Sequence, residues 1–129
     1  MKIAITATAA SLDADIDPRF GRCRYFVIAD PDTMEFEALE NSGAIAGGGV
    51  GVSAAQMIAG KGVEAVLTGN CGPNAYQILS AAGIKVITGV VGKVQGGIQG
   101  YKSGKFKVSS QPDVPGHFGT GRGRGIGRR

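Results

Sequence analysis

The order of hydrophobic and polar positions along the chain predicts eight regular elements. Short runs of small and β-branched residues indicate strands. The polar segment Ser11–Cys23, which contains Pro18 and Gly21, indicates a long loop. Met34–Asn41 alternates apolar and acidic residues, the pattern of a half-exposed strand, and pairs in a hairpin with the strand before it. The predicted strands are Lys2–Ala9, Arg24–Asp30, Met34–Asn41, Val63–Gly69 and Ile84–Gly89.

Three further segments predict helices. Pro73–Gly83 has proline in its first turn and glycine past its end, and Val52–Gly62 ends at two glycines. Lys93–Gly104 is a weak helix, because each internal glycine costs about 1 kcal/mol relative to alanine. The order βββαβαβα predicts an α/β fold with a five-stranded mixed sheet flanked by helices, the ribonuclease H-like arrangement. A short Rossmann-like sheet is the alternative, and the early hairpin argues against it.

The charge of the chain is unevenly distributed. Residues 1–115 hold ten Lys or Arg and ten Asp or Glu, so the net charge of +4 comes from Arg122, Arg124, Arg128 and Arg129. The low-complexity Gly/Arg sequence cannot bury apolar surface. We therefore predict a domain over residues 1–107 and a disordered basic tail over 108–129. This tail makes polyanion or nucleic-acid binding an alternative function.

The two cysteines, Cys23 and Cys71, lie in separate segments and form no CxxC pair. Free thiols in a reducing cytosol are favoured over one long-range disulfide. The N-terminus has no signal-peptide pattern, and no apolar run approaches the length that spans a bilayer. We therefore expect a cytoplasmic protein.

Several kinds of chemistry are disfavoured by the positions of the reactive residues. The first predicted strand, Lys2–Ala9, carries no carboxylate, whereas two-metal nucleases need several that converge. The only histidine, His117, lies in the predicted tail, so Cys71 has no evident general base. Two cysteines and a tail histidine do not supply the four ligands of a structural zinc site. Gly49, Gly51 and Ala54 match a dinucleotide fingerprint only weakly, because no acid follows about 20 residues later.

Three loops are the candidate walls of one ligand pocket, because they are expected at the same end of the sheet. The first surrounds Cys23 with arginines, the second is a glycine loop that leads into a helix, and the third places Cys71 at a helix entrance. A helix N-terminus lowers a thiol pKa and attracts anions. Cys71 is open to three interpretations: a small capping residue, a ligand or sulfide contact, and a thiolate nucleophile. The candidate residues are Arg19, Phe20, Gly21, Arg22, Cys23, Gly48, Gly49, Gly69, Asn70, Cys71, Gly72, Pro73 and Asn74.

Three stretches resemble the nitrogenase iron–molybdenum cofactor-binding family, which includes the NifX and NifY carriers and the C-terminal part of NifB. They are "DPRFGRCRYFVIAD", "GVEAVLTGNCGPNAYQILSAAGIKV" and "YKSGKF", and the similarity covers about residues 1–107. Within the family, the chain is most similar to the small stand-alone "orange protein" type, which carries a molybdenum–copper sulfide cluster.

The resemblance implies a ribonuclease H-like fold without enzymatic activity that binds, carries or stores an anionic metal–sulfur cluster. A molybdenum–copper sulfide cluster is the first expectation, and an iron–molybdenum sulfide cluster is the alternative. Cys23 and Cys71 are the candidate metal ligands. A P-loop ATPase partner is implied by the family alone, and the chain is expected to be a monomer or weak dimer. Such a cluster brings its own sulfides, so arginines, backbone N–H groups and close glycine approach can hold it.

Overall fold

The fold is a mixed β-sheet with helices on both faces. The computed structural model describes residues 1–41, 50–106 and 108. The strand order is β3-β2-β1-β4-β5, in which β2 is antiparallel to both of its neighbours and β1, β4 and β5 are parallel. The elements are β1 (Ile3–Ala7), β2 (Tyr25–Ala29), β3 (Phe36–Glu40), α1 (Val50–Ala59), β4 (Ala65–Leu67), α2 (Pro73–Ala81), β5 (Lys85–Ile87) and α3 (Val94–Lys102). The predicted α/β class and five-stranded mixed sheet are confirmed.

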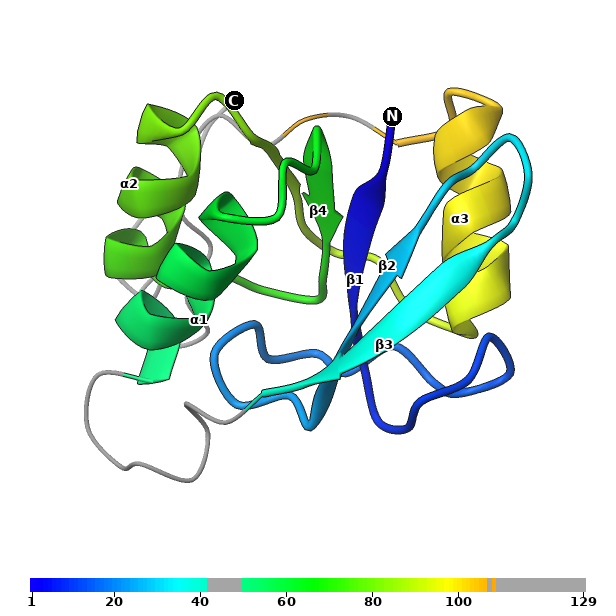
Figure 1. The fold of residues 1–129 in the computed structure, drawn as a ribbon, viewed down its shortest axis with the longest axis horizontal. Helices are drawn as coiled ribbons and strands as arrows, with labels where there is room; N and C mark the ends of the chain where they lie inside the picture. The colour runs from blue at the N-terminus through cyan, green and yellow to red at the C-terminus, as the bar shows by residue number, and fades with distance from the viewer. Residues whose placement is uncertain (42–49, 107, 109–129) are drawn as a thin grey trace, which may run out of the picture.

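Two hydrophobic cores lie on opposite faces of the sheet. Helices α1 and α2 cover one face, and α3 covers the other (Figure 1). Successive residues of a strand point to opposite faces, so β1 contributes Ala4 to the first core and Ile3 and Ile5 to the second. This position between two helical layers explains why all five residues of β1 are buried.

The predicted elements are all present, but their boundaries differ. Helix α1 begins at Val50, two residues earlier than predicted, and the strands are shorter than their apolar runs. Met34 is predicted to be a strand residue, but it lies before β3. It has a φ of 64° and completes the β2–β3 turn, in which its N–H bonds the Asp30 carbonyl at 2.8 Å. The turn thus overrides the alternating pattern, because the chain must reverse before Phe36 can pair with Ala29.

The loops that follow β1, β4 and β5 gather at one edge, the carboxyl end of the sheet. This follows from the parallel pairing of β1 with β4 and of β4 with β5. The loop after β1 lies at the lower side of Figure 1, as does the start of α1. Within the part of the chain that the structure describes, no helix has the length and apolarity needed to cross a bilayer.

Candidate functional site

The loop after β1 docks directly onto the loop after β4. Arg19 and Asn70 form an isolated parallel bridge: the Phe20 N–H donates to the Asn70 carbonyl at 3.2 Å, and the Asn70 N–H donates to the Pro18 carbonyl at 2.7 Å. At Gly69, a Cβ atom would lie 2.5 Å from the Pro18 Cα and 2.7 Å from the Pro18 oxygen. Only glycine therefore permits this contact between loops about 50 residues apart.

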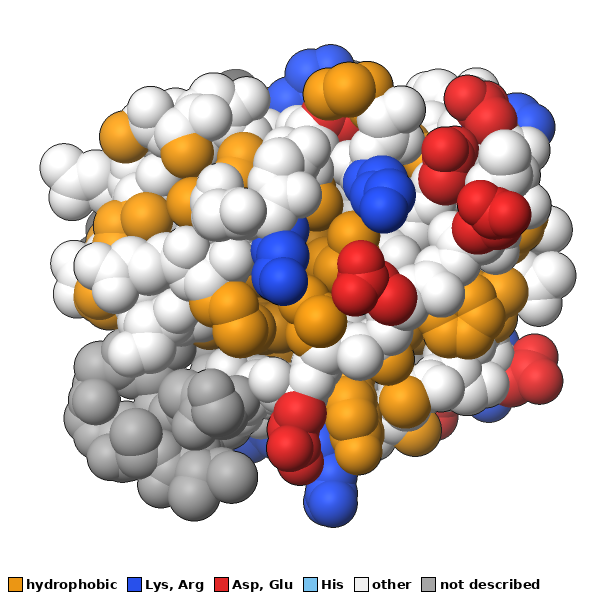
Figure 2. Space-filling model, in the orientation of Figure 1, with side chains coloured by type: hydrophobic (Ala, Val, Ile, Leu, Met, Phe, Trp, Pro, Cys, Tyr) orange, Lys and Arg blue, Asp and Glu red, His pale blue; other side chains and the backbone are white. Residues whose placement is uncertain are grey.

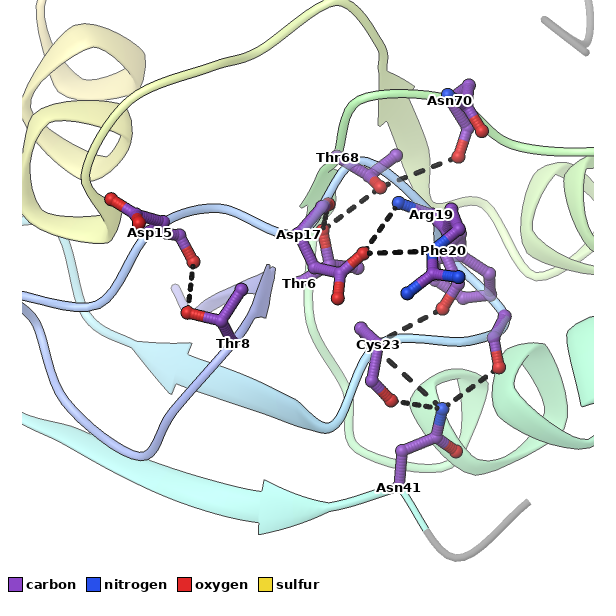
Figure 3. Close-up of polar contacts among 11 residues, drawn as sticks. Thr6, Thr8, Asp15, Asp17, Arg19, Phe20, Cys23, Asn41, Thr68 and Asn70 are labelled. Atoms are coloured by element: carbon purple, nitrogen blue, oxygen red, sulfur yellow. Dashed lines mark hydrogen bonds and ion pairs between the residues drawn. The ribbon is translucent and has the colours of Figure 1, made fainter. Parts of the chain in front are cut away.

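A buried threonine pair holds the start of both loops (Figure 3). Thr6 is the last but one residue of β1 and lies beside Thr68, which directly follows β4. Their hydroxyl oxygens lie 3.0 Å apart. The Thr6 hydroxyl donates to the Asp17 carbonyl at 2.7 Å, and the Asp17 N–H donates back to the Thr6 carbonyl at 2.9 Å. These bonds fix where the first loop returns to the sheet. Sequence reasoning missed both threonines, because only the register of β1 against β4, in which Ile5 pairs with Leu67, brings them side by side.

Asp17 is the buried anchor of the arginine-rich turn. Only 6% of the residue is exposed, and its Oδ1 accepts a 2.9 Å hydrogen bond from the Arg19 N–H. The Arg19 Nε lies 3.5 Å from the same oxygen. The carboxylate therefore orients the Arg19 backbone and its guanidinium group. Asp17 is not among the candidate residues predicted from the sequence.

The arginines of the turn lie at the surface. The Arg19 side chain is 60% exposed, and Arg22 and Arg24 are exposed as well. The Arg24 guanidinium carbon lies 6.0 Å from the centre of the Tyr25 ring, at the outer limit of a cation–π contact. The two aromatic residues Phe20 and Phe26 pack below with ring centres 5.3 Å apart. The turn thus presents positive charge outward on an apolar base.

Cys23 is buried, which corrects the expectation of a thiol in an electropositive loop. Its side chain is fully inaccessible, and its Sγ donates to the Phe20 carbonyl at 3.3 Å. Burial, and next the negative charge of Asp17, raise the pKa of the Cys23 thiol to about 12. The arginines do not counter this effect, because their side chains are exposed whereas the thiol faces the core.

Cys71 is also buried, so the expectation of a lowered pKa at a helix entrance is wrong. The residue is 1% exposed, belongs to the same core as Cys23, and burial raises the pKa of its thiol to about 12. Loss of hydration outweighs the helix dipole. In this conformation both thiols are neutral at pH 7, and their predicted role as metal ligands stays a prediction.

The entrance of α2 completes this side of the site. Gly72 is the N-cap residue, Pro73 opens the helix, and no side chain caps its first turn. Pro73 and Asn74 are exposed, and Gly69, Asn70 and Gly72 are partly exposed. The dipole of α2 and its first-turn N–H groups therefore favour negative charge near this surface.

Asn41 stabilises the arginine-rich turn and was missed by the sequence reasoning. Its Nδ2 donates to the Gly21 carbonyl at 3.0 Å and to the Cys23 carbonyl at 2.9 Å. Its Oδ1 is buried and has no hydrogen-bond partner among the described residues. Asn41 directly follows β3, and only the pairing of β3 with β2 brings it beside Cys23, so no local pattern indicates this role.

The loop after β5 also joins the site, which the sequence did not indicate. The Gly89 N–H donates to the Gly69 carbonyl at 2.8 Å, and the Ile16 N–H donates to the Gly92 carbonyl at 2.8 Å. The predicted glycine loop, with Gly48 and Gly49, lies outside the described residues. Within the described ranges, no three His, Cys, Asp or Glu side chains form a group that could hold a metal ion.

The fold and the loops define an α/β domain with an arginine-lined, loop-built surface at the carboxyl end of its sheet. Residues 1–104 match the family model described as dinitrogenase iron–molybdenum cofactor. The chain belongs to this family.

The similar structures agree with the family. The apo form of the orange protein from Desulfovibrio gigas has a TM-score of 0.84 and 39% identity, over 88% of this chain and 96% of that one. A putative NifB protein from Thermotoga has a TM-score of 0.75 and 33% identity, over 89% and 98%. An uncharacterized protein of Methanocaldococcus jannaschii is 34% identical over 90 residues, which is 67% of this chain and 76% of that protein.

Proposed function

We propose that the protein binds, carries or stores an anionic metal–sulfur cluster at the carboxyl end of its sheet and does not act as an enzyme. The observation that carries the proposal is the docking of the Asp17–Cys23 turn onto Gly69 and Asn70, which brings the exposed Arg19 beside Asn70, close to the start of α2, where no side chain caps the helix. A soft anion gains from guanidinium groups, backbone N–H groups and the helix dipole together. Membership of the iron–molybdenum cofactor family supports the same class of cargo.

The residues fit a cluster that supplies its own sulfides better than a single metal ion. Both thiols are buried and neutral at pH 7, so neither offers a ready thiolate. Arg19, Arg22 and the partly exposed Gly21 are accessible instead. We therefore assign the primary contacts to arginines and backbone, and we propose Cys23 and Cys71 only as secondary contacts that need local rearrangement.

A molybdenum–copper sulfide cluster is the particular cargo that we propose, with iron–molybdenum sulfide as the alternative. The likeness to the orange protein of Desulfovibrio gigas favours the former through the resemblance described above. The strand order β3-β2-β1-β4-β5 supports assigning the ribonuclease H-like motif. The P-loop ATPase partner, the monomer or weak dimer and the cytoplasmic location stay predictions. Polyanion binding by the tail also stays a prediction, since that segment lies outside the described residues.

Reconstitution tests the proposal. The protein is incubated with tetrathiomolybdate and copper(I), or with molybdate, iron and sulfide, and is then desalted. We expect a visible absorption band that elutes with the protein, and metal analysis identifies the cargo. The proposal is overturned if no band remains with the protein under any of these conditions.

The double variant Cys23→Ala/Cys71→Ala separates the two modes of attachment. We expect it to retain the coloured species, because the accessible contacts are not thiols. Loss of the species in this variant, while circular dichroism remains unchanged, would instead make the cysteines primary ligands.

A further inference from the structure

The outer edge of β3 is an interaction surface that the proposed cluster site does not use. β3 is the last strand of the sheet, and the described residues contain no strand on its outer side. Residues that face each other across β2 and β3 have numbers that sum to 65. At the two ends of this ladder, the Asn41 N–H donates to the Arg24 carbonyl and the Asp30 N–H donates to the Glu35 carbonyl, each at 2.9 Å. Hydrogen-bonded pairs alternate along an antiparallel ladder. The backbone groups of Phe36, Ala38 and Glu40 therefore face outward.

Most of the charged side chains around this edge are acidic, and Lys2 is the exception among the pocket residues there. Glu35, Glu37 and Glu40 are exposed, and Phe36 is 43% exposed. A shallow pocket at the start of the strand is lined by Lys2, Ile28, Asp30, Glu35, Phe36 and Glu37. Figure 2 looks onto this edge and shows acidic side chains gathered over the β2–β3 turn and β3. A basic, extended segment would match both the charge and the open backbone groups.

The Gly/Arg-rich end of the chain is a basic segment whose residue pattern suits an extended backbone. From Gly119 to Gly127 every second residue is glycine, so an extended backbone would project Arg122, Arg124, Ile126 and Arg128 on a single face. Glu37 and Leu39 of β3 likewise share one face with Glu35, which directly precedes the strand. Leu39 packs on this face against the α1/α2 core. The order acid, acid, apolar at residues 35, 37 and 39 has the same two-residue spacing as Arg, Arg, Ile at residues 122, 124 and 126 of the tail.

We propose that the Arg/Gly tail of the chain, residues 122–128, binds along the outer edge of β3 as an additional extended segment. The tether permits this, because the fourteen steps from Val108 to Arg122 span up to about 45 Å when extended. A domain of this size has a radius of gyration of only about 13 Å. A second copy paired β3 to β3 is disfavoured, since it would bring the glutamates of both copies together. The proposal stands independently of cluster binding.

Amide hydrogen exchange by NMR on the full chain tests the proposal. At low salt, the outward N–H groups of Phe36, Ala38 and Glu40 should exchange more slowly in the full chain than in the variant Arg122→Gln/Arg124→Gln/Arg128→Gln. The exchange rates should differ by at least about twofold, which corresponds to a tail that is bound half of the time. The N–H groups of Glu37 and Leu39 bond β2 and serve as internal controls. The difference should disappear at high salt, because the contact is ionic and exposed.

Two further variants complete the test. The variant Glu35→Gln/Glu37→Gln should lose the protection of the outward amides. The control variant Asp13→Asn/Asp15→Asn removes the same charge from the loop after β1 and should keep this protection. Equal exchange of the outward amides in the full chain and in the arginine variant would overturn the proposal. Protection that increases with protein concentration would overturn it as well, since the tail of a second copy would then be the occupant.

Discussion

At the scale of single residues, the contact between the loops after β1 and β4 depends on three side chains and on the lack of a side chain at Gly69. Asp17 orients Arg19, and Thr6 and Thr68 fix the two loops to the sheet. Gly69 has no side chain, which lets Pro18 approach it. None of these residues carries an exposed functional group. They contribute to the site by fixing the position of the arginine-rich turn.

Replacing Gly69 with alanine should separate the two loops. The added Cβ would overlap backbone atoms of Pro18, which cannot move as a flexible side chain can. We expect a loss of about 1–3 kcal/mol in the free energy of unfolding, the usual cost of overpacking, measured by urea denaturation. An unchanged unfolding midpoint would contradict the close contact.

The buried thiols should make the protein sensitive to alkaline pH. Both have a pKa of about 12 in the folded state against an ordinary value of 9.0. Below pH 9 the thiols are protonated in both states and have no effect. Above it only the unfolded state loses protons, so the free energy of unfolding should fall as pH rises from 9 towards 12, by up to about 1.4 kcal/mol per pH unit for each thiol.

Urea denaturation of the wild type and of Cys23→Ala/Cys71→Ala at several pH values checks this effect. The variant should show a flatter alkaline decline. Tyr101 contributes to what remains, because burial and its hydrogen bond to Glu64 raise its pKa to about 12. Equal slopes in both proteins would mean that the thiols ionise as freely in the folded state as in the unfolded state.

At the scale of elements, the packing of α3 explains why this helix contains glycine at two of its three glycine positions. Gly97 and Gly100 are buried, and a Cβ at Gly100 would lie 2.6 Å from the Phe106 ring. A Cβ at Gly97 would lie 3.0 Å from the Ile16 side chain. Glycine lowers the helix propensity at these two positions, but it permits the close packing of Ile16 and Phe106 against α3. The sequence predicted the weak helix correctly but could not indicate which glycines are needed.

Two substitutions in α3 should have opposite effects. Gly96→Ala meets no atom within 4 Å and should stabilise the protein by about 1 kcal/mol through helix propensity. Gly100→Ala should destabilise it, because Phe106 must leave its position. Thermal unfolding followed by circular dichroism compares the two. Stabilisation by both substitutions would show that the packing of Phe106 on Gly100 contributes little.

At the scale of the whole molecule, parallel pairing brings the loops of the candidate site to one end of the sheet. The loops after β1, β4 and β5 contact one another through backbone hydrogen bonds, and α2 begins beside them. Helices that follow parallel strands run back toward the opposite end, so Lys61 and Lys102 lie remote from the site. This arrangement offers a matched test of the arginines.

Arg19→Gln/Arg22→Gln should weaken retention of a reconstituted cluster by roughly tenfold or more, since each hydrogen bond to a charged group contributes about 1.5–3 kcal/mol. Lys61→Gln/Lys102→Gln removes the same charge from the opposite end and should have little effect. Absorbance after desalting at increasing salt measures retention. Equal losses in both variants would indicate attraction by net charge alone.

The sequence by itself determined the order of the elements, the mixed sheet and the loops that carry the candidate residues, because these depend on local periodicity, turn residues and caps. The motifs around Cys23 and Cys71 were also sufficient to indicate the family. Only the tertiary structure decided that both thiols are buried, that Gly69 must be glycine, and that Asp17, Thr6 and Thr68 hold the turn. These properties arise from contacts between residues up to 62 positions apart, and strand pairing, which no local pattern encodes, brings them together.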